Sequence, residues 1–256
     1  MSSVLDDAAP PQVDAPPPRL WSGTRREVAA SAVLLAIAAV AWWWSVRDAD
    51  MGMAMSFAAF ITAWVVMMVA MMLPAVAPVV RLYARAAERG RAAPTPVFLA
   101  GYLIVWSAIG VPGYFAWREL MDPLMMGEPW AGRLAGGVLV AAGLYQLTPL
   151  KDVCLRHCRS PMSLFLQSQG GLTKPLTALS TGMRHGVYCL GCCWALMACL
   201  VAVGTMNPLA MVAIATLIFL EKNLAHGELV ARLAAVVLLG LGAWLLYAPM
   251  DVTHLT

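Results

Sequence analysis

Two short clusters of cysteines contain the residues of this sequence that are best suited to chemistry. They read CLRHC, starting at Cys154, and CLGCC, starting at Cys189, and Cys199 follows the second cluster. Thiolates and imidazoles are soft ligands that suit Cu(I) and Zn(II). The metal-binding candidates in and beside the clusters are Cys154, His157, Cys158, His185, Cys189, Cys192 and Cys193. The alternatives are disulfide exchange and simple packing, since cysteine also behaves as a small apolar side chain.

Helical spacing brings these candidates onto shared faces. At about 100° per residue, four residues around the second cluster fall within about 80° of one another: His185, Cys189, Cys192 and Cys199. Cys193 lies just off that stripe. Cys154 and Cys158 are four residues apart, so both sulfurs lie on one face of a helix. We predict that the two clusters share one metal site, because Pro149 begins the first helix at the membrane depth of the second cluster.

Methionine, with 17 residues, is the second source of soft ligands. Thioethers are neutral donors that favour Cu(I) over hard cations. One array is Met51-Gly-Met53-Ala-Met55, and a second repeats at helical spacing as Met67, Met68, Met71 and Met72. The first could instead be the interfacial start of a helix, and the second could be flexible core filler.

Glu221 and Lys222 end an apolar run and are further candidates, because ionisable residues at membrane depth are often functional. At a helix end they could instead snorkel to the interface or pair with each other. The chain has no paired carboxylates at a working spacing, no Gly-rich phosphate loop and no Ser-His-Asp order. We therefore expect a binding protein, not an enzyme, and we find no nucleic-acid site.

The elements that must position these residues are membrane helices. Hydrophobic residues make up 61% of the chain and charged residues 12%, against about 45–50% and 25% in soluble domains. A helix needs about 20 apolar residues to cross a bilayer. Seven apolar runs come near that length: 27–46, 54–80, 97–117, 130–149, 185–205, 207–222 and 229–248. We expect an all-α bundle with lipid as its first partner, and Pro74 and Pro78 either kinking the second run or ending it in an amphipathic turn.

Basic residues predict the orientation of the bundle, since cytoplasmic loops carry the Lys/Arg excess. The N-terminal tail and the loops after runs two, four and six carry 3, 4, 5 and 2 Lys or Arg, against 1, 2, 0 and 0 in the alternate segments. We predict a cytoplasmic N-terminus and an outer C-terminus. Both cysteine clusters then lie at the cytoplasmic side, where thiols stay reduced.

The chain divides into three parts around one membrane domain. We expect residues 1–27, which are Pro-rich and polar, to be disordered, residues 28–248 to form a single helical domain, and 249–256 to form a short outer tail. Within the domain, the segment 150–184 is too polar to span. Thr148 can cap a helix that begins at Pro149 and stops at about Arg159, before Pro161. We expect this amphipathic segment to lie on the cytoplasmic face or to re-enter the membrane.

The sequence resembles a bacterial family of metal-binding integral membrane proteins associated with copper chaperoning for copper oxidases. The matching stretches lie between about residues 51 and 246, and they are Met67–Pro74, Tyr145–Lys151 continuing into Cys154–Pro161, Gly186–Met197 with its Cys-x-x-Cys-Cys-Trp core, and Glu221-Lys222. The resemblance implies metal binding in the bacterial inner membrane, with a copper oxidase or another metalloenzyme as partner.

Three hypotheses follow for the function. The first is a Cu(I)-binding chaperone or transfer protein, for which zinc is the second metal that the ligands suit. The second is a membrane thiol–disulfide oxidoreductase or redox sensor built on the same cysteine pairs. The third is an accessory subunit of a larger membrane enzyme.

Overall fold

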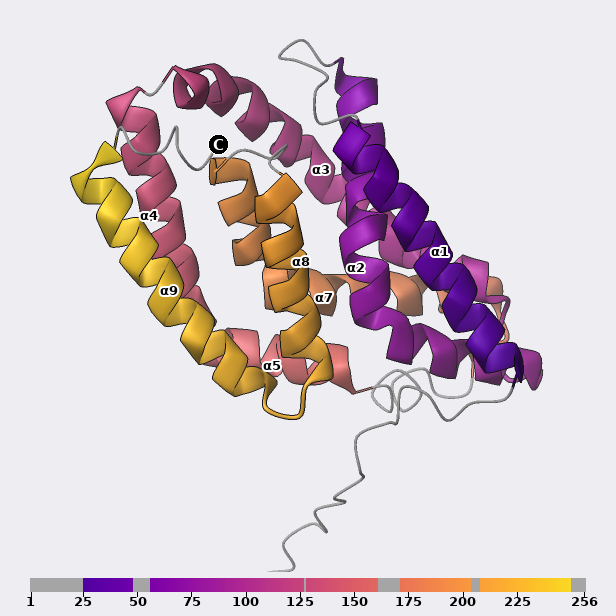
Figure 1. Ribbon diagram of the computed structural model, residues 1–256. Helices are drawn as coiled ribbons and strands as arrows, with labels where there is room; N and C mark the ends of the chain where they lie inside the picture. The colour runs from indigo at the N-terminus through magenta and orange to yellow at the C-terminus, as the bar shows by residue number, and fades with distance from the viewer. Residues whose placement is uncertain (1–24, 48–55, 127, 161–170, 204–207, 250–256) are drawn as a thin grey trace, which may run out of the picture.

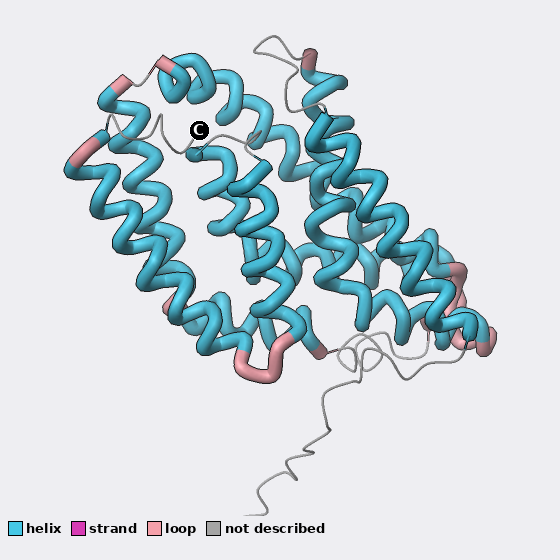
Figure 2. Tube along the Cα trace, in the orientation of Figure 1, coloured by secondary structure: helices cyan, strands magenta, loops and turns pink. Residues whose placement is uncertain are grey.

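The computed structural model describes residues 25–47, 56–126, 128–160, 171–203 and 208–249. This part of the chain is built from helices and contains no strand, as the tube in Figure 2 shows. The all-α prediction is therefore confirmed for the described residues. The Met51, Met53 and Met55 array lies outside them, as do most of the predicted tails.

The helices run up and down between two ends of a bundle (Figure 1). In chain order they are α1 (Arg25–Arg47), α2 (Phe57–Glu88), α3 (Thr95–Met125), α4 (Pro129–Gln146), α5 (Pro149–Arg159), α7 (Pro175–Val203), α8 (Pro208–Asn223) and α9 (Gly227–Tyr247). The short α5 lies at the end of the bundle where α4 finishes and where α8 turns into α9. We call this end the α5 end. The first helix overlaps the predicted 1–27 tail by residues 25–27.

Four of the described helices are long and apolar enough to cross a membrane: α2, α3, α7 and α9. A fifth span is obtained if α4 and α5 form one broken span, bent by 68°. Among the described residues, α1 contributes a shorter apolar stretch, Leu35–Trp44, and α8 has 16 residues. The prediction of helices long and apolar enough to cross a membrane is confirmed for these helices, while the count of seven is not.

The second apolar run forms a helix longer than the sequence predicts. α2 continues through Pro74 and Pro78 and beyond residue 80 to Glu88. Ser56 begins it, since its hydroxyl accepts a hydrogen bond from the backbone N–H of Ala59. Gly90 follows its end with φ of 68°, a left-handed conformation that suits glycine.

The helix predicted after the fourth run is confirmed. α5 spans Pro149–Arg159, and the Thr148 hydroxyl accepts a hydrogen bond from the Lys151 N–H at its start. The expected extent of the polar segment, 150–184, was wrong at its far end, because α7 already begins at Pro175. Proline suits the first helical turn, and the Ser180 and Thr181 hydroxyls donate to the Thr177 carbonyl, so these polar residues do not end the helix.

Glycines allow the helices around the cysteines to pack closely. A Cβ on Gly101 of α3 would collide with the Leu179 carbonyl of α7, and one on Gly182 of α7 would collide with the Phe98 carbonyl of α3. Small residues let membrane helices approach backbone to backbone in this way. On the other side of the bundle, Gly136 of α4 and Gly242 of α9 meet similarly. The resulting core has two parts, one around α2, α3, α5 and α7 and a smaller one between α4, α7 and α9.

Candidate functional site

The bend between α4 and α5 sets the position of the first cysteine cluster. α5 turns by 68° from α4 and packs against α7. Lys151, Leu155 and Cys158 are its buried residues, and they recur at i, i+4 and i+7 on one face. This face therefore brings Cys158 against the second cysteine cluster.

Four thiols meet where α5 crosses α7. The Cys158 side chain interacts with the side chains of both Cys189 and Cys192. The thiols of Cys192 and Cys193 donate to the Cys189 carbonyl, with S–O distances of 3.0 Å and 2.9 Å. All four side chains are buried and are free thiols. We call Cys158, Cys189, Cys192 and Cys193 the thiol group; it draws on two helices.

Lys222 of α8 points into the thiol group. Its Nζ lies 3.0 Å from the Cys189 Sγ and 3.9 Å from the Met72 Sδ. The Tyr102 hydroxyl oxygen of α3 is also 3.0 Å from the Cys189 sulfur. A buried cation and a phenol from two further helices thus contact one cysteine, and a thioether from a third contacts the cation.

His185 lies one turn before Cys189 on α7 and is buried. Its ring centroid is 6.0 Å from those of Phe98 and Tyr102. The Nε2 has no hydrogen-bond partner among the described residues. A buried polar atom without a partner is costly, so this nitrogen has the capacity for a ligand.

The thiol group does not include three further residues: His157, Cys154 and Cys199. The His157 ring stacks on Tyr188, with centroids 4.7 Å apart, and its Nδ1 is 2.8 Å from the Val153 carbonyl oxygen. Cys154 is half-buried against α7, where a Cβ on Gly191 would be 2.7 Å from its Sγ. Burial raises the pKa of this Cys154 thiol, and the neighbouring Cys192 raises it further. Cys199 packs instead in the smaller core with residues of α4 and α9.

The four methionines of α2 are all buried in the larger core: Met67, Met68, Met71 and Met72. Of these, Met72 reaches the thiol group through the contact of its Sδ with Lys222. The other three stack up the same helix toward its N-terminus. Their burial shows that they fill the core.

Glu221 and Lys222 point to different partners. The Lys151 Nζ lies 2.8 Å from the Glu221 Oε2 and also donates to the Gln146 Oε1. Gln146 in turn donates from Nε2 to the Glu221 Oε1, at 2.9 Å. These three buried side chains join the α4–α5 corner to α8 and are called the polar lock. Glu221 therefore balances Lys151, and the two adjacent residues do not pair with each other.

Sequence reasoning missed Gln146 and Lys151 as members of the site. Lys151 entered the sequence analysis of orientation only as one of the basic residues after the fourth apolar run, yet it is fully buried. Both residues lie in the Tyr145–Lys151 stretch that carries the family resemblance. That stretch was the feature of the sequence from which they could have been identified. Tyr145 itself donates from its hydroxyl to the Gly191 carbonyl, 2.5 Å away, and so ties α4 to α7.

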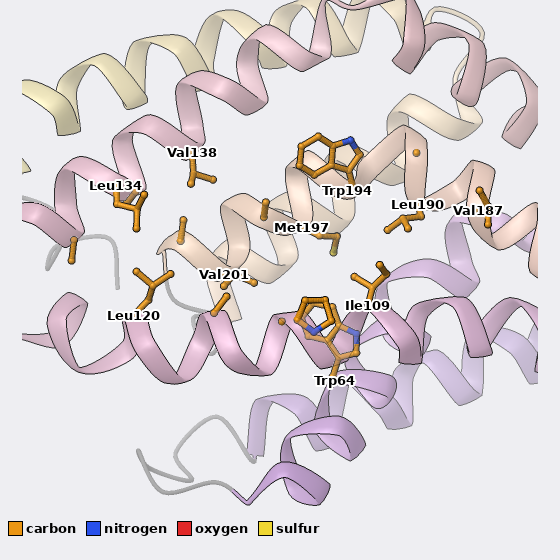
Figure 3. A pocket seen from close by; sticks show the side chains of 18 residues that line it. Trp64, Ile109, Leu120, Leu134, Val138, Val187, Leu190, Trp194, Met197 and Val201 are labelled. Atoms are coloured by element: carbon orange, nitrogen blue, oxygen red, sulfur yellow. The ribbon is translucent and has the colours of Figure 1, made fainter.

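An apolar cavity of about 620 Å³ lies on the other side of α7 (Figure 3). Trp64, Leu134, Trp194 and Met197 are among its lining residues, which come from α2, α3, α4 and α7. Among the described lining residues there is no cysteine, and Met197 is the one that contains sulfur. The thiol group and the cavity therefore occupy different faces of the same helix.

The thiol group is not a ready-made metal cage. Within the described residues, no three His, Cys, Asp or Glu side chains are arranged to hold an ion. Two thiols are turned toward the Cys189 carbonyl instead, and the Cys189 sulfur faces Lys222 and Tyr102. Binding of an ion would require these thiols to rotate away from their hydrogen bonds.

Comparison with known proteins identifies the family. The model of the family PpoB2, described as copper chaperone, matches residues 61–245. The match includes the thiol group, Met72, Lys222 and the polar lock. Neither the curated proteins nor the solved structures include a match to the chain. The resemblance seen in the sequence is confirmed, and the chain belongs to the PpoB2 copper chaperone family.

Proposed function

We propose that this protein is an integral membrane chaperone that carries Cu(I) on the thiol group and passes it to a copper-using enzyme. The observation that carries the proposal is the meeting of Cys158 from α5 with Cys189 and Cys192 from α7. Sulfur ligands from two elements can close around a soft ion, whereas one helix offers fewer well-placed donors. The copper chaperone family supports this role and suggests binding rather than catalysis.

The chemistry of such a site is ligand exchange. Cu(I) is the cargo, and each thiol that binds it gives its proton to solvent. The Met72 thioether is a neutral soft donor beside the group. His185 is proposed as a further donor, because its Nε2 is free within the described structure. A Cu(I) ion held by few ligands leaves room for an incoming ligand of the partner protein. Transfer by ligand exchange therefore needs no nucleotide.

The direction of the route follows from the predicted orientation. With a cytoplasmic N-terminus, the α5 end and the thiol group face the cytoplasm of a bacterial cell, at its inner membrane. Met67, Met68 and Met71 would lead away from the thiol group along α2, toward Met51, Met53 and Met55 at the outer side. We propose that these methionine thioethers bind Cu(I) in turn along this path, and that a copper oxidase receives the ion.

Copper binding by purified protein tests this function. The protein in detergent would be titrated with Cu(I) against a chromophoric Cu(I) chelator under reducing, anaerobic conditions. We expect binding that is lost in a variant with all six cysteines replaced by serine. A Cys199→Ser variant is the matched control and should retain binding, since Cys199 packs in the other core. Equal Cu(I) binding by the wild type and the six-serine variant would refute the proposal.

Disulfide exchange is the second candidate, and the same contacts favour it. Cys158 adjoins two other thiols, which is the arrangement of an attacking and a resolving cysteine. Alkylation mapping after oxidant treatment separates the two functions. If a cysteine pair becomes protected from alkylation at the redox potential of the cytoplasm, the result favours redox chemistry. Full alkylation of all six thiols would favour the copper function.

A further inference from the structure

Lys222 is a buried cation that meets no carboxylate among the described residues. Its neighbours are the Cys189 sulfur at 3.0 Å and the Met72 sulfur at 3.9 Å. The nearby carboxylate of Glu221 is already engaged by Lys151 and Gln146. A buried charge is costly unless an opposite charge lies close by. The thiol group is the place where such a negative charge can form.

We propose that Lys222 makes the site selective for monovalent over divalent soft ions. The inference rests on the proposed function and assigns the choice of ion to one side chain. Thiolates that bind an ion create a complex whose charge is the ion's charge minus the number of thiolates. For the same thiolates, a monovalent ion leaves the complex one unit more negative than a divalent ion does.

The lysine therefore stabilises the two kinds of complex unequally. Lys222 attracts a more negative complex more strongly, whatever the number of thiolates, and low-dielectric surroundings enlarge the difference. The Cys189 sulfur has further lone pairs, so it can bind an ion while it still accepts the Lys222 hydrogen bond. Softness alone would not separate Ag(I) from Cd(II), since thiolates bind both. Charge does separate them.

The experiment compares Ag(I) with Cd(II), two soft ions that differ in charge. Both affinities would be measured by competition for the full-length protein in detergent, in the wild type, in Lys222→Leu and in Lys222→Arg. We expect the Ag(I)/Cd(II) affinity ratio to fall by about 10–100-fold in Lys222→Leu, the range expected for neighbours of a metal ligand. Lys222→Arg keeps the charge and should keep most of the wild-type ratio. Cu(I) and Zn(II) should repeat the pattern.

An unchanged ratio in folded Lys222→Leu would overturn the inference. This holds if both affinities stay at the wild-type value, and it also holds if both fall by equal factors, which would mark a merely structural role of Lys222. If Lys222→Leu does not fold, Lys222→Gln takes its place, because glutamine is neutral but can still donate a hydrogen bond. Its Ag(I)/Cd(II) ratio should fall in the same range, and an unchanged ratio would overturn the inference. Failure of the proposed function would give a different result from failure of this inference. The wild type would then bind Ag(I) and Cd(II) no more tightly than the six-serine variant does.

Discussion

Lys151 of α5 and Glu221 of α8 form a buried ion pair, with 2.8 Å between Nζ and Oε2. The pair fixes the bent helix α5 to the last turn of α8. The next residue of α8, Lys222, then reaches the thiol group that α5 and α7 form. Glu221 of α8 thus holds α5 in place, and its neighbour Lys222 brings a positive charge to the thiol group.

Breaking the polar lock should destabilise the fold. Lys151→Met leaves Glu221 buried without its cation, and removal of one partner of a buried pair costs about 3–5 kcal/mol. The free energy of unfolding, measured with denaturant in detergent, should fall by about that amount. The double variant Lys151→Met/Glu221→Leu should recover most of the loss, because it leaves no unpaired charge.

The exposed pair Arg118–Glu119 provides the control for this experiment. Its side chains are 57% and 71% exposed, and Glu119→Gln should leave the unfolding free energy unchanged within error. A double variant as unstable as Lys151→Met alone would show that the lock does not act as a charge pair.

Cys158→Ser and Cys192→Ser should weaken Cu(I) binding non-additively. Both thiols belong to one group, so the first substitution already disrupts the site and the second adds little. Competition titrations of the two single variants and the double variant would measure this coupling. Losses that add as independent free energies would instead assign the two cysteines to separate sites.

Glycine at position 182 should be required for the packing of α3 on α7. Gly182→Ala sets a Cβ against the Phe98 carbonyl, so the two helices must separate. We expect a loss of about 1–3 kcal/mol in unfolding free energy, as for other overpacked positions, together with weaker Cu(I) binding because α7 carries Cys189. Gly137→Ala is the control, since nothing lies within 4 Å of its added Cβ. It should be neutral or stabilising by up to about 1 kcal/mol, and equal losses in both variants would contradict the packing argument.

The orientation of the protein can be tested by labelling single cysteines in the six-serine background. We expect Ser2→Cys to react with an impermeant reagent only after the cytoplasmic face is opened. His254→Cys should react from outside in intact cells. The reason is the excess of Lys and Arg in alternate loops. Labelling of His254→Cys only from the cytoplasm would rule out the predicted odd number of spans.

The sequence by itself determined the features that depend on local spacing. Thr148 and Pro149 begin α5 as expected, since capping and proline preferences act within one turn. The 3.6-residue period placed His185, Cys189 and Cys192 on one face of α7. The family resemblance also followed from short stretches alone, and the family match confirms it.

Only the tertiary structure decided which faces meet. The 68° bend after α4 turns Cys158 toward α7, leaves Cys154 half-buried against Gly191, and places His157 on Tyr188. It also buries Lys151, which the sequence analysis counted only among the basic residues between the fourth and fifth apolar runs. Glu221 and Lys222 diverge because successive helical residues point about 100° apart, so their partners depend on where α5 and α7 lie. Such contacts join residues about 30 to 150 positions apart, beyond the reach of any local pattern.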